Sequence, residues 1–122
     1  LSNMGDLIND FRSYRAKMNE KVLATDAKII KRVYSLDTLT YQDGVLPAKT
    51  KEMLGLATSA VLRCDDCIKY HLEQCYREGV TTDEIMEIFG VACVVGGTIV
   101  ITHMRRGVEY WLALCEQGEN RE

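Results

Sequence analysis

The stretch CDDCIKYHLEQCYREGVTTDEI, residues 64–85, contains the signals for one helix, its end and the beginning of the next. Apolar side chains recur every three to four positions in its first half, a spacing that places them on one face of an α-helix. Gly79 suits the left-handed backbone conformation that ends many helices. Thr81 and Glu84 have the spacing of a capping box, in which each side chain accepts a hydrogen bond from the other residue's backbone N–H. We therefore predict a helix that begins near residues 64–66 and ends at Gly79, and a second that opens at Thr81.

Apolar residues recur at helical spacing along the rest of the chain as well, and they predict four further helices. Pro47 suits the first position of one of them, because the N–H at that position has no partner within the helix. Gly96 and Gly97 are expected to bend or end the helix that opens at Thr81. The β-branched residues between 94 and 101 leave one alternative open, a short buried strand. The sequence thus predicts an all-α fold of about six helices, with apolar stripes over residues 7–22, 29–34, 53–61, 68–75, 85–92 and 101–115.

The length and composition indicate one globular domain over residues 1–122. Hydrophobic residues make up 47% of the chain and charged residues 27%, as is typical of a soluble protein. Residues 1–51 contain 9 Lys and Arg against 6 Asp and Glu, whereas residues 52–122 contain 6 against 12. Neither half has a dense basic cluster, so we expect no nucleic-acid partner.

The sequence predicts a cytoplasmic protein with no membrane partner. Its longest uncharged stretch, Ile88 to Met104, contains three glycines and is shorter than the ~20 apolar residues that a membrane-spanning helix needs. Charged residues at positions 6, 10 and 12 interrupt any apolar signal region. The chain has five cysteines, an odd number. Without a secretory signal, this count indicates reduced thiols rather than a disulfide scaffold.

The run from Cys64 to His71 combines groups that support thiol chemistry. Cys67 and His71 lie four residues apart, which on a helix places them on one face about one turn from each other. An imidazole there can accept the thiol proton and leave the reactive thiolate. Cys64 is near enough to form a disulfide with Cys67, and the unpaired N–H groups at the beginning of a helix stabilise a thiolate. These groups suffice for reversible thiol–disulfide exchange or for peroxide reduction through a sulfenic acid.

Two other interpretations of this run stay open. The cysteines and His71 also continue an apolar stripe, so they could be ordinary core residues. The run could instead bind zinc, because the CxxC pair and His71 supply three ligands and Cys75 or Glu52 could supply a fourth. No second CxxC pair or histidine pair completes such a site at a familiar spacing. We expect neither a metal nor a cofactor.

The sequence from about residue 46 to residue 104 resembles the AhpD-like branch of the carboxymuconolactone decarboxylase superfamily. The pattern of that branch is a glutamate, a cysteine twelve residues on, a second cysteine closing CxxC, and a histidine four residues later. This chain keeps every spacing with Glu52, Cys64, Cys67 and His71. The resemblance implies an all-helical, single-domain AhpD-like bundle and a thiol-dependent alkylhydroperoxidase.

The resemblance also implies a role for each of these residues. Cys67 would attack the peroxide and become a sulfenic acid, and Cys64 would resolve it to a disulfide. His71 would take the proton, and Glu52, whose alternative is a solvated surface charge, would complete the relay. The implied partners are a peroxide substrate, a thiol or dithiol reductant and further copies of the chain in a homo-oligomer, a trimer or a hexamer.

One position departs from the pattern. The residue before the second cysteine is often histidine in peroxidases of this branch, whereas here it is Asp66, beside Asp65. Two carboxylates suit the first turn of a helix. They would nevertheless disfavour a neighbouring thiolate by like-charge repulsion. This departure bears on peroxidase activity and not on the redox pair itself.

Three further features lie outside this pattern. His103, followed by two arginines, could bind an anionic substrate or could serve a helix surface or a subunit contact. Cys75, Cys93 and Cys115 lie on apolar stripes and are predicted to be core residues. Residues 91–101 have too little polarity for the surface of a small monomer, so they indicate either central core or a subunit interface.

Two functions from other classes remain as alternatives. The first is lactone decarboxylation, as in the founding member of the superfamily, but that reaction has no need of a CxxC pair. The second is a binding or assembly protein whose thiols only sense redox state. Replacing Cys64 and Cys67 separates these functions, because peroxide turnover needs the thiols and decarboxylation does not.

Overall fold

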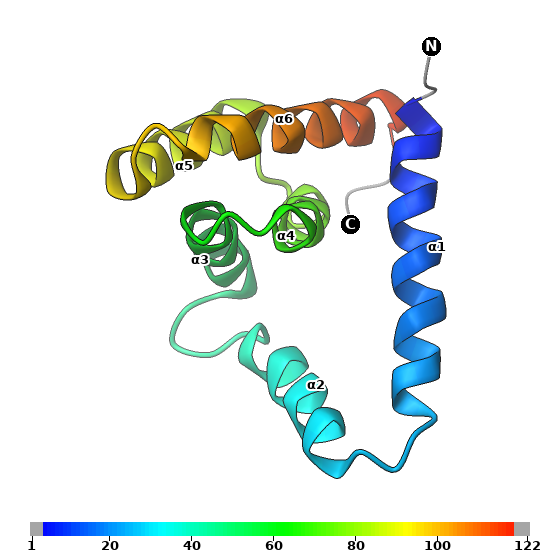
Figure 1. Ribbon diagram of the computed structural model, residues 1–122. Coiled ribbons are helices and arrows are strands. Elements are labelled where there is room, and N and C mark those ends of the chain that lie inside the picture. The colour runs from blue at the N-terminus through cyan, green and yellow to red at the C-terminus, as the bar shows by residue number, and fades with distance from the viewer. Residues whose placement is uncertain (1–3, 119–122) are drawn as a thin grey trace.

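The computed structural model describes residues 4–118, and this part of the chain is made of α-helices joined by short connections (Figure 1). It contains no strand between residues 4 and 118, so the all-α prediction is confirmed and the alternative strand over residues 94–101 is wrong. The six helices are α1 (Met4–Leu23), α2 (Lys28–Thr40), α3 (Ala48–Val61), α4 (Asp65–Arg77), α5 (Thr82–Gly96) and α6 (Val100–Gln117). No helix within the described residues combines the length and apolar character needed to cross a membrane.

The local signals place most helix ends where they were predicted. Gly79 follows α4 with a φ of +82°, and Thr81 opens α5 with both hydrogen bonds of the capping box. Gly97, with a φ of +88°, ends α5. Pro47 lies one residue before α3, because its ψ of 156° is extended rather than helical.

The core lies where α3 and α4 pack side by side and α5 and α6 cover them (Figure 1). The largest fully buried side chains include Trp111, Tyr110 and Phe89, and burial of each such side chain stabilises the fold by about 1.5–3 kcal/mol. Gly107 allows α6 to approach closely, since a Cβ there would lie 2.9 Å from the Phe89 ring and 3.0 Å from Ile68. The close crossing fixes α4, which carries the CxxC run.

A buried carboxylate joins α1 to this core. Glu73 of α4 accepts a hydrogen bond from Arg12 of α1 at 2.6 Å and another from the Tyr110 hydroxyl of α6 at 2.7 Å. A buried charge with both oxygens occupied in this way holds its neighbours in place, because removing a partner leaves the charge uncompensated. The bond between Arg12 and Glu73 keeps α1 beside α4, and one face of α1 lines the site.

Helix α2 differs from the others because none of its side chains is buried. Figure 1 shows it extending away from the core, between the end of α1 and the loop to α3. Tyr34 donates a hydrogen bond to Asn19 of α1 at 2.9 Å. At the C-terminal end of α2, the Lys51 ammonium of α3 donates to the carbonyls of Thr40 and Gln42, at 2.9 and 2.7 Å. These contacts hold the helix at its middle and at its C-terminal end, and most of its apolar side chains stay exposed.

Candidate active site

A left-handed turn between α3 and α4 positions the first cysteine. Arg63 has a φ of +61°, and the N–H of Cys64 donates to the carbonyl of Ser59 at 3.1 Å. Glycine usually takes this conformation, and a side chain there costs about 1–2 kcal/mol. The turn reverses the chain within two residues, so that Cys64 becomes the N-cap of α4.

Cys64 and Cys67 form a disulfide at the beginning of α4. The Cys67 side chain is exposed and that of Cys64 is half-buried. The Cys64 sulfur also accepts the backbone N–H of Cys67, at 3.2 Å. The two sulfurs therefore differ. The sulfur of Cys67 is accessible, whereas a negative charge on the sulfur of Cys64 would be stabilised by the N-terminus of α4.

His71 and Glu52 form a buried pair across the α3–α4 contact. The distance from His71 Nδ1 to Glu52 Oε1 is 2.8 Å, and both side chains are buried. Because a carboxylate only accepts hydrogen bonds, the hydrogen on the imidazole lies on Nδ1 and the basic nitrogen is Nε2. Glu52 thus bonds to His71 directly and is buried, so it is not the solvated surface charge that the sequence left as an alternative.

Gly55 makes this pairing possible. It is buried in α3 directly against the imidazole, and a Cβ on it would lie 2.6 Å from Cε1, 2.8 Å from Nδ1 and 2.9 Å from Nε2 of His71. A side chain at this position would force the imidazole or the two helices to move. The absence of a side chain at Gly55 lets α3 approach α4 closely enough for Glu52 to bond to Nδ1.

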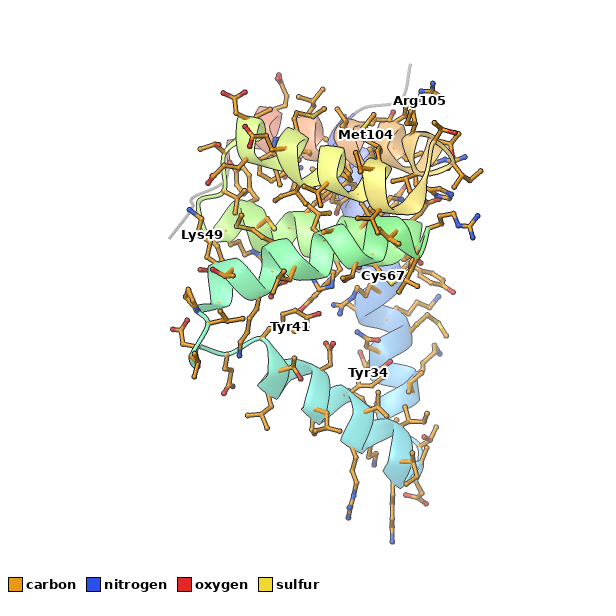
Figure 2. The ribbon with its side chains drawn as sticks, turned by 90° about the vertical axis from the view of Figure 1, so that its left-hand side faces the viewer. Tyr34, Tyr41, Lys49, Cys67, Met104 and Arg105 are labelled. Carbon is orange, nitrogen blue, oxygen red and sulfur yellow. A yellow bond between two sulfur atoms is a disulfide. The ribbon has the colours of Figure 1, made fainter. Side chains whose placement is uncertain are left out.

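Tyr41 is a site residue that the sequence did not indicate. It follows α2, and its hydroxyl lies 3.5 Å from His71 Nε2, with the two rings 5.1 Å apart. Figure 2 shows the tyrosine between the end of α2 and α3. Burial, with the carboxylates of Asp37 and Glu52, raises the pKa of Tyr41, so the phenol stays protonated. Its hydroxyl can donate to Nε2 of the neutral ring or accept from Nε2–H once that nitrogen is protonated. No motif links Tyr41 to a histidine 30 residues later, so only the tertiary structure could reveal it.

Tyr70 covers the other side of the imidazole. Its ring meets that of His71 edge to face at 5.3 Å, and the guanidinium of Arg15 lies 4.2 Å from the centre of the Tyr70 ring. Burial and the charge of Glu52 raise the pKa of Tyr70. The rings of Tyr41 and Tyr70 both pack against the imidazole, which is buried.

Cys67 and His71 line one pocket of about 310 Å³, enclosed by α1, α2 and α4. Its wall on α1 is largely apolar, and three charged side chains, one guanidinium and two carboxylates, also border it. A pocket of this kind suits a small amphipathic molecule whose reactive end reaches Cys67. The remaining lining residues are Phe11, Tyr14, Arg15, Met18, Asn19, Asp37, Asp66 and Tyr70.

The two aspartates of the CxxC run lie in different environments. Asp65 accepts a hydrogen bond from His103 Nδ1 at 2.7 Å and pairs with Arg106 at 3.4 Å, whereas Asp66 borders the pocket. His103 and Arg106 thus offset the charge of Asp65, and the repulsion expected from two carboxylates falls mainly to Asp66. His103 binds this carboxylate of its own chain, which is a different role from binding an anionic substrate.

The other three cysteines lie away from the pair. Cys75 is fully buried, and burial raises its pKa to about 12, so it stays a protonated thiol at neutral pH. Cys93 and Cys115 are half-buried at the edge of the core. Across residues 4–118, no three histidine, cysteine or acidic side chains are grouped so that they could hold a metal ion.

Comparison with known proteins agrees with this fold. The sequence pattern described as the carboxymuconolactone decarboxylase family matches residues 27–109. One crystal structure of a Thermotoga maritima protein matches with a TM-score of 0.87 at 48% identity, covering 89% of this chain and 96% of that one. Another, with a TM-score of 0.85 at 46% identity, covers 93% and 98%; it is described as a protein of this family with a suggested involvement in the antioxidative response.

More distant relatives match over a smaller part or at lower identity. A Legionella pneumophila protein of the family shares the fold, with a TM-score of 0.71 at 23% identity over 88% of this chain and 93% of that one. An uncharacterised protein of Cupriavidus necator is 32% identical over 73 residues, 60% of this chain. A protein of the cox locus of Paracoccus denitrificans is 30% identical over 74 residues, 61% of this chain. The matched segment spans 65% and 67% of these two relatives.

Proposed function

The chain belongs to the carboxymuconolactone decarboxylase family, and we propose that it is a thiol-dependent peroxidase and disulfide oxidoreductase working through Cys64 and Cys67. One observation carries the proposal: an accessible cysteine of a disulfide pair shares a pocket with a histidine that is bonded to a buried carboxylate. The suggested antioxidative role of the Thermotoga maritima relative is consistent with it.

In the oxidative half of the cycle, the reduced Cys67 thiol gives its proton to His71 Nε2 and attacks the outer oxygen of a hydroperoxide. The O–O bond breaks, Cys67 becomes a sulfenic acid, and the departing alkoxide takes the proton to leave as an alcohol. The Cys64 thiol then attacks the Cys67 sulfur, forms the disulfide and releases water. Glu52 supports these steps because its charge stabilises the imidazolium that forms at His71.

In the reductive half, a thiol of the reductant attacks the exposed sulfur of Cys67. The bond to Cys64 breaks, and Cys64 leaves as a thiolate stabilised by the N–H of Cys67 and by the helix terminus. A second thiol of the reductant then resolves the mixed disulfide, so the reductant is oxidised to a disulfide and the protein regains both thiols. The same step, run with other disulfides, is the oxidoreductase activity.

Peroxide consumption by the reduced protein with a small dithiol tests the proposal. We expect turnover in the parent and none in Cys67→Ser, and a loss of about 10²–10⁴-fold in His71→Ala, the range of general acid–base catalysis. Tyr41→Phe removes the hydroxyl that accepts a hydrogen bond from Nε2–H after the proton transfer, and should reduce turnover about 3- to 10-fold, the value of one hydrogen bond. Cys75→Ala is the matched thiol control and should keep full turnover.

The outcomes separate the candidate functions. If no peroxide is consumed while the pair still cycles between dithiol and disulfide, the peroxidase claim fails and disulfide exchange or redox sensing remains. Lactone decarboxylation that survives replacement of both Cys64 and Cys67 would instead favour the founding activity of the superfamily. Turnover that survives Cys67→Ser would overturn the assignment of the nucleophile.

A further inference from the structure

The pocket that contains Cys67 and His71 adjoins a larger and more polar cavity between α1 and α2. This outer cavity has a volume of about 570 Å³. Figure 1 shows α1 and α2 as two arms joined by a short loop, with α4 near the open end between them. Four residues line both cavities: Arg15, Asn19, Asp37 and Tyr70. A molecule with its reactive atom at Cys67 can therefore extend its other end into the outer cavity.

Arg15 on α1 brings a positive charge to both cavities. Its guanidinium lies over the Tyr70 ring, 4.2 Å from the ring centre, and this cation–π contact fixes its place. Within residues 4–118, no carboxylate forms an ion pair with it. The contact with the ring does not neutralise the guanidinium, so its N–H donors remain available to a ligand carboxylate.

Asp37 brings the opposite charge from the facing helix, α2. It also borders both cavities, and no lysine, arginine or histidine in the described part of the chain forms an ion pair with it. Burial and the charge of Glu52 raise the pKa of Tyr70. Arg15 lowers that pKa and Asp37 raises it further, so both charges lie near the same phenol. The two charges thus stand on opposite walls without pairing to each other.

Three other polar side chains of the outer cavity bond within the protein. The Tyr34 hydroxyl donates to Asn19 at 2.9 Å, and the Thr38 hydroxyl donates to the backbone carbonyl of Tyr34 at 3.2 Å. The cavity therefore keeps its unpaired charge at two places, on the guanidinium of Arg15 and on the carboxylate of Asp37.

These two charges match an α-amino acid head group, which carries a carboxylate and an ammonium on one carbon. The carboxylate can accept from Arg15, and the ammonium can donate to Asp37. A ligand with only a negative charge would meet the carboxylates of Asp37 and Asp66, and a ligand with only a positive charge would meet Arg15. The zwitterion is the ligand that uses both walls.

We propose that the thiol reductant is a small zwitterionic thiol, a cysteine-containing amino acid or short peptide with a free α-ammonium and a free α-carboxylate. Its carboxylate binds Arg15, its ammonium binds Asp37, and its sulfur reaches the exposed sulfur of Cys67. The disulfide of the same compound is the substrate when the exchange runs in reverse. This inference rests on the proposed disulfide oxidoreductase function and names the substrate class for it.

The exchange consumes two molecules of the thiol for each protein disulfide. The first gives its proton to His71, and its thiolate attacks the Cys67 sulfur. The bond to Cys64 breaks, and the Cys64 thiolate takes up the proton. A second thiolate attacks the ligand sulfur of the mixed disulfide, and its proton goes to the departing Cys67 thiolate. The ligand is thus oxidised to its own disulfide, and the protein pair is reduced to two thiols.

Four small thiols separate the contributions of the two head-group charges. Cysteine carries the ammonium and the carboxylate, N-acetylcysteine only the carboxylate, cysteamine only the ammonium, and 2-mercaptoethanol neither. The readout is the rate at which each thiol, in excess, opens the Cys64–Cys67 disulfide, measured by mass spectrometry after acid quenching and alkylation. The rate for a variant is divided by the rate for the parent with the same thiol, so that differences in intrinsic thiol reactivity cancel.

Each substitution should affect only the thiols that carry the matching charge. We expect Arg15→Gln to slow cysteine and N-acetylcysteine about 3- to 10-fold relative to 2-mercaptoethanol, and Asp37→Asn to slow cysteine and cysteamine by a similar factor. Both side chains are exposed, so water weakens each contact and keeps the factor modest. Lys17→Gln and Glu20→Gln, on exposed positions of α1 outside both cavities, are the matched charge controls and should show no such selectivity.

The outcomes distinguish this inference from the proposed function. Equal effects on all four thiols, or selectivity lost in only one of the two variants, would overturn the zwitterionic head group. Dependence on both residues with glutathione instead of cysteine would support it and place the head group in the outer cavity, because that head group lies further from the sulfur. A disulfide opened by dithiothreitol without any head-group selectivity contradicts this inference alone. A disulfide that no thiol opens contradicts the oxidoreductase function as well.

Discussion

Replacing Gly55 with alanine should separate His71 from its carboxylate while leaving the thiol pair untouched. The added Cβ would lie 2.6–2.9 Å from three atoms of the imidazole, whereas ordinary contacts begin near 3.4 Å. The ring therefore has to move by about 1 Å, or α3 and α4 have to separate by a similar distance. Either movement lengthens the 2.8 Å bond between Nδ1 and Glu52 beyond good hydrogen-bond geometry.

The effects on stability and on activity differ in size. Alanine is favoured over glycine inside a helix by about 1 kcal/mol, and overpacking a tight contact costs about 1–3 kcal/mol. The free energy of unfolding should therefore fall by no more than about 2 kcal/mol. A catalytic group displaced by about 1 Å, in contrast, can reduce a rate about 100-fold. We expect Gly55→Ala to remain folded and to lose most of its peroxide turnover.

Gly90→Ala provides the matched control, because a Cβ at that helical position meets nothing within 4 Å. It should gain up to about 1 kcal/mol of stability and keep full turnover. The measurements are urea denaturation for stability and peroxide consumption across pH for activity, where loss of the Glu52 partner should also shift the profile. Turnover and a pH profile equal to those of the parent in Gly55→Ala would refute the role assigned to the His71–Glu52 pair.

Two other predictions concern the pH dependence of stability and the charges around the thiols. Burial raises the pKa of Cys75 from 9.0 to about 12, so its stabilising contribution is complete below pH 9 and is lost as the pH rises toward 12, by up to about 1.4 kcal/mol per pH unit. Urea denaturation at alkaline pH should show a shallower loss in Cys75→Ala, and an unchanged slope would exclude this thiol as the source. His103→Ala leaves the charge of Asp65 less compensated, so alkylation of the reduced Cys67 at neutral pH should slow by about 2- to 5-fold. Faster alkylation would show that His103 does not act by offsetting Asp65.

The sequence by itself determined the features that arise within one or two helical turns. The capping box at Thr81, the end of α4 at Gly79 and the four-residue spacing of Cys67 and His71 all depend on residues close together in the chain. Helical periodicity likewise predicted all six helices, including α2, because an apolar stripe is a property of one segment. The spacing also indicated the disulfide, since the N-cap position of Cys64 brings it within one turn of Cys67.

Only the tertiary structure decided how these segments meet. The bond between Glu52 and His71 requires a close crossing of α3 and α4 at Gly55, and no local signal specifies where two helices cross. Tyr41 reaches the same imidazole from a third segment, and the pairing of His103 with Asp65 joins residues 38 positions apart. The stripe of α2 is the sharpest case. Its periodicity predicted a helix, but none of the side chains of that helix is buried. Whether an apolar stripe is covered depends on how the other helices are arranged, which the periodicity of one segment does not specify.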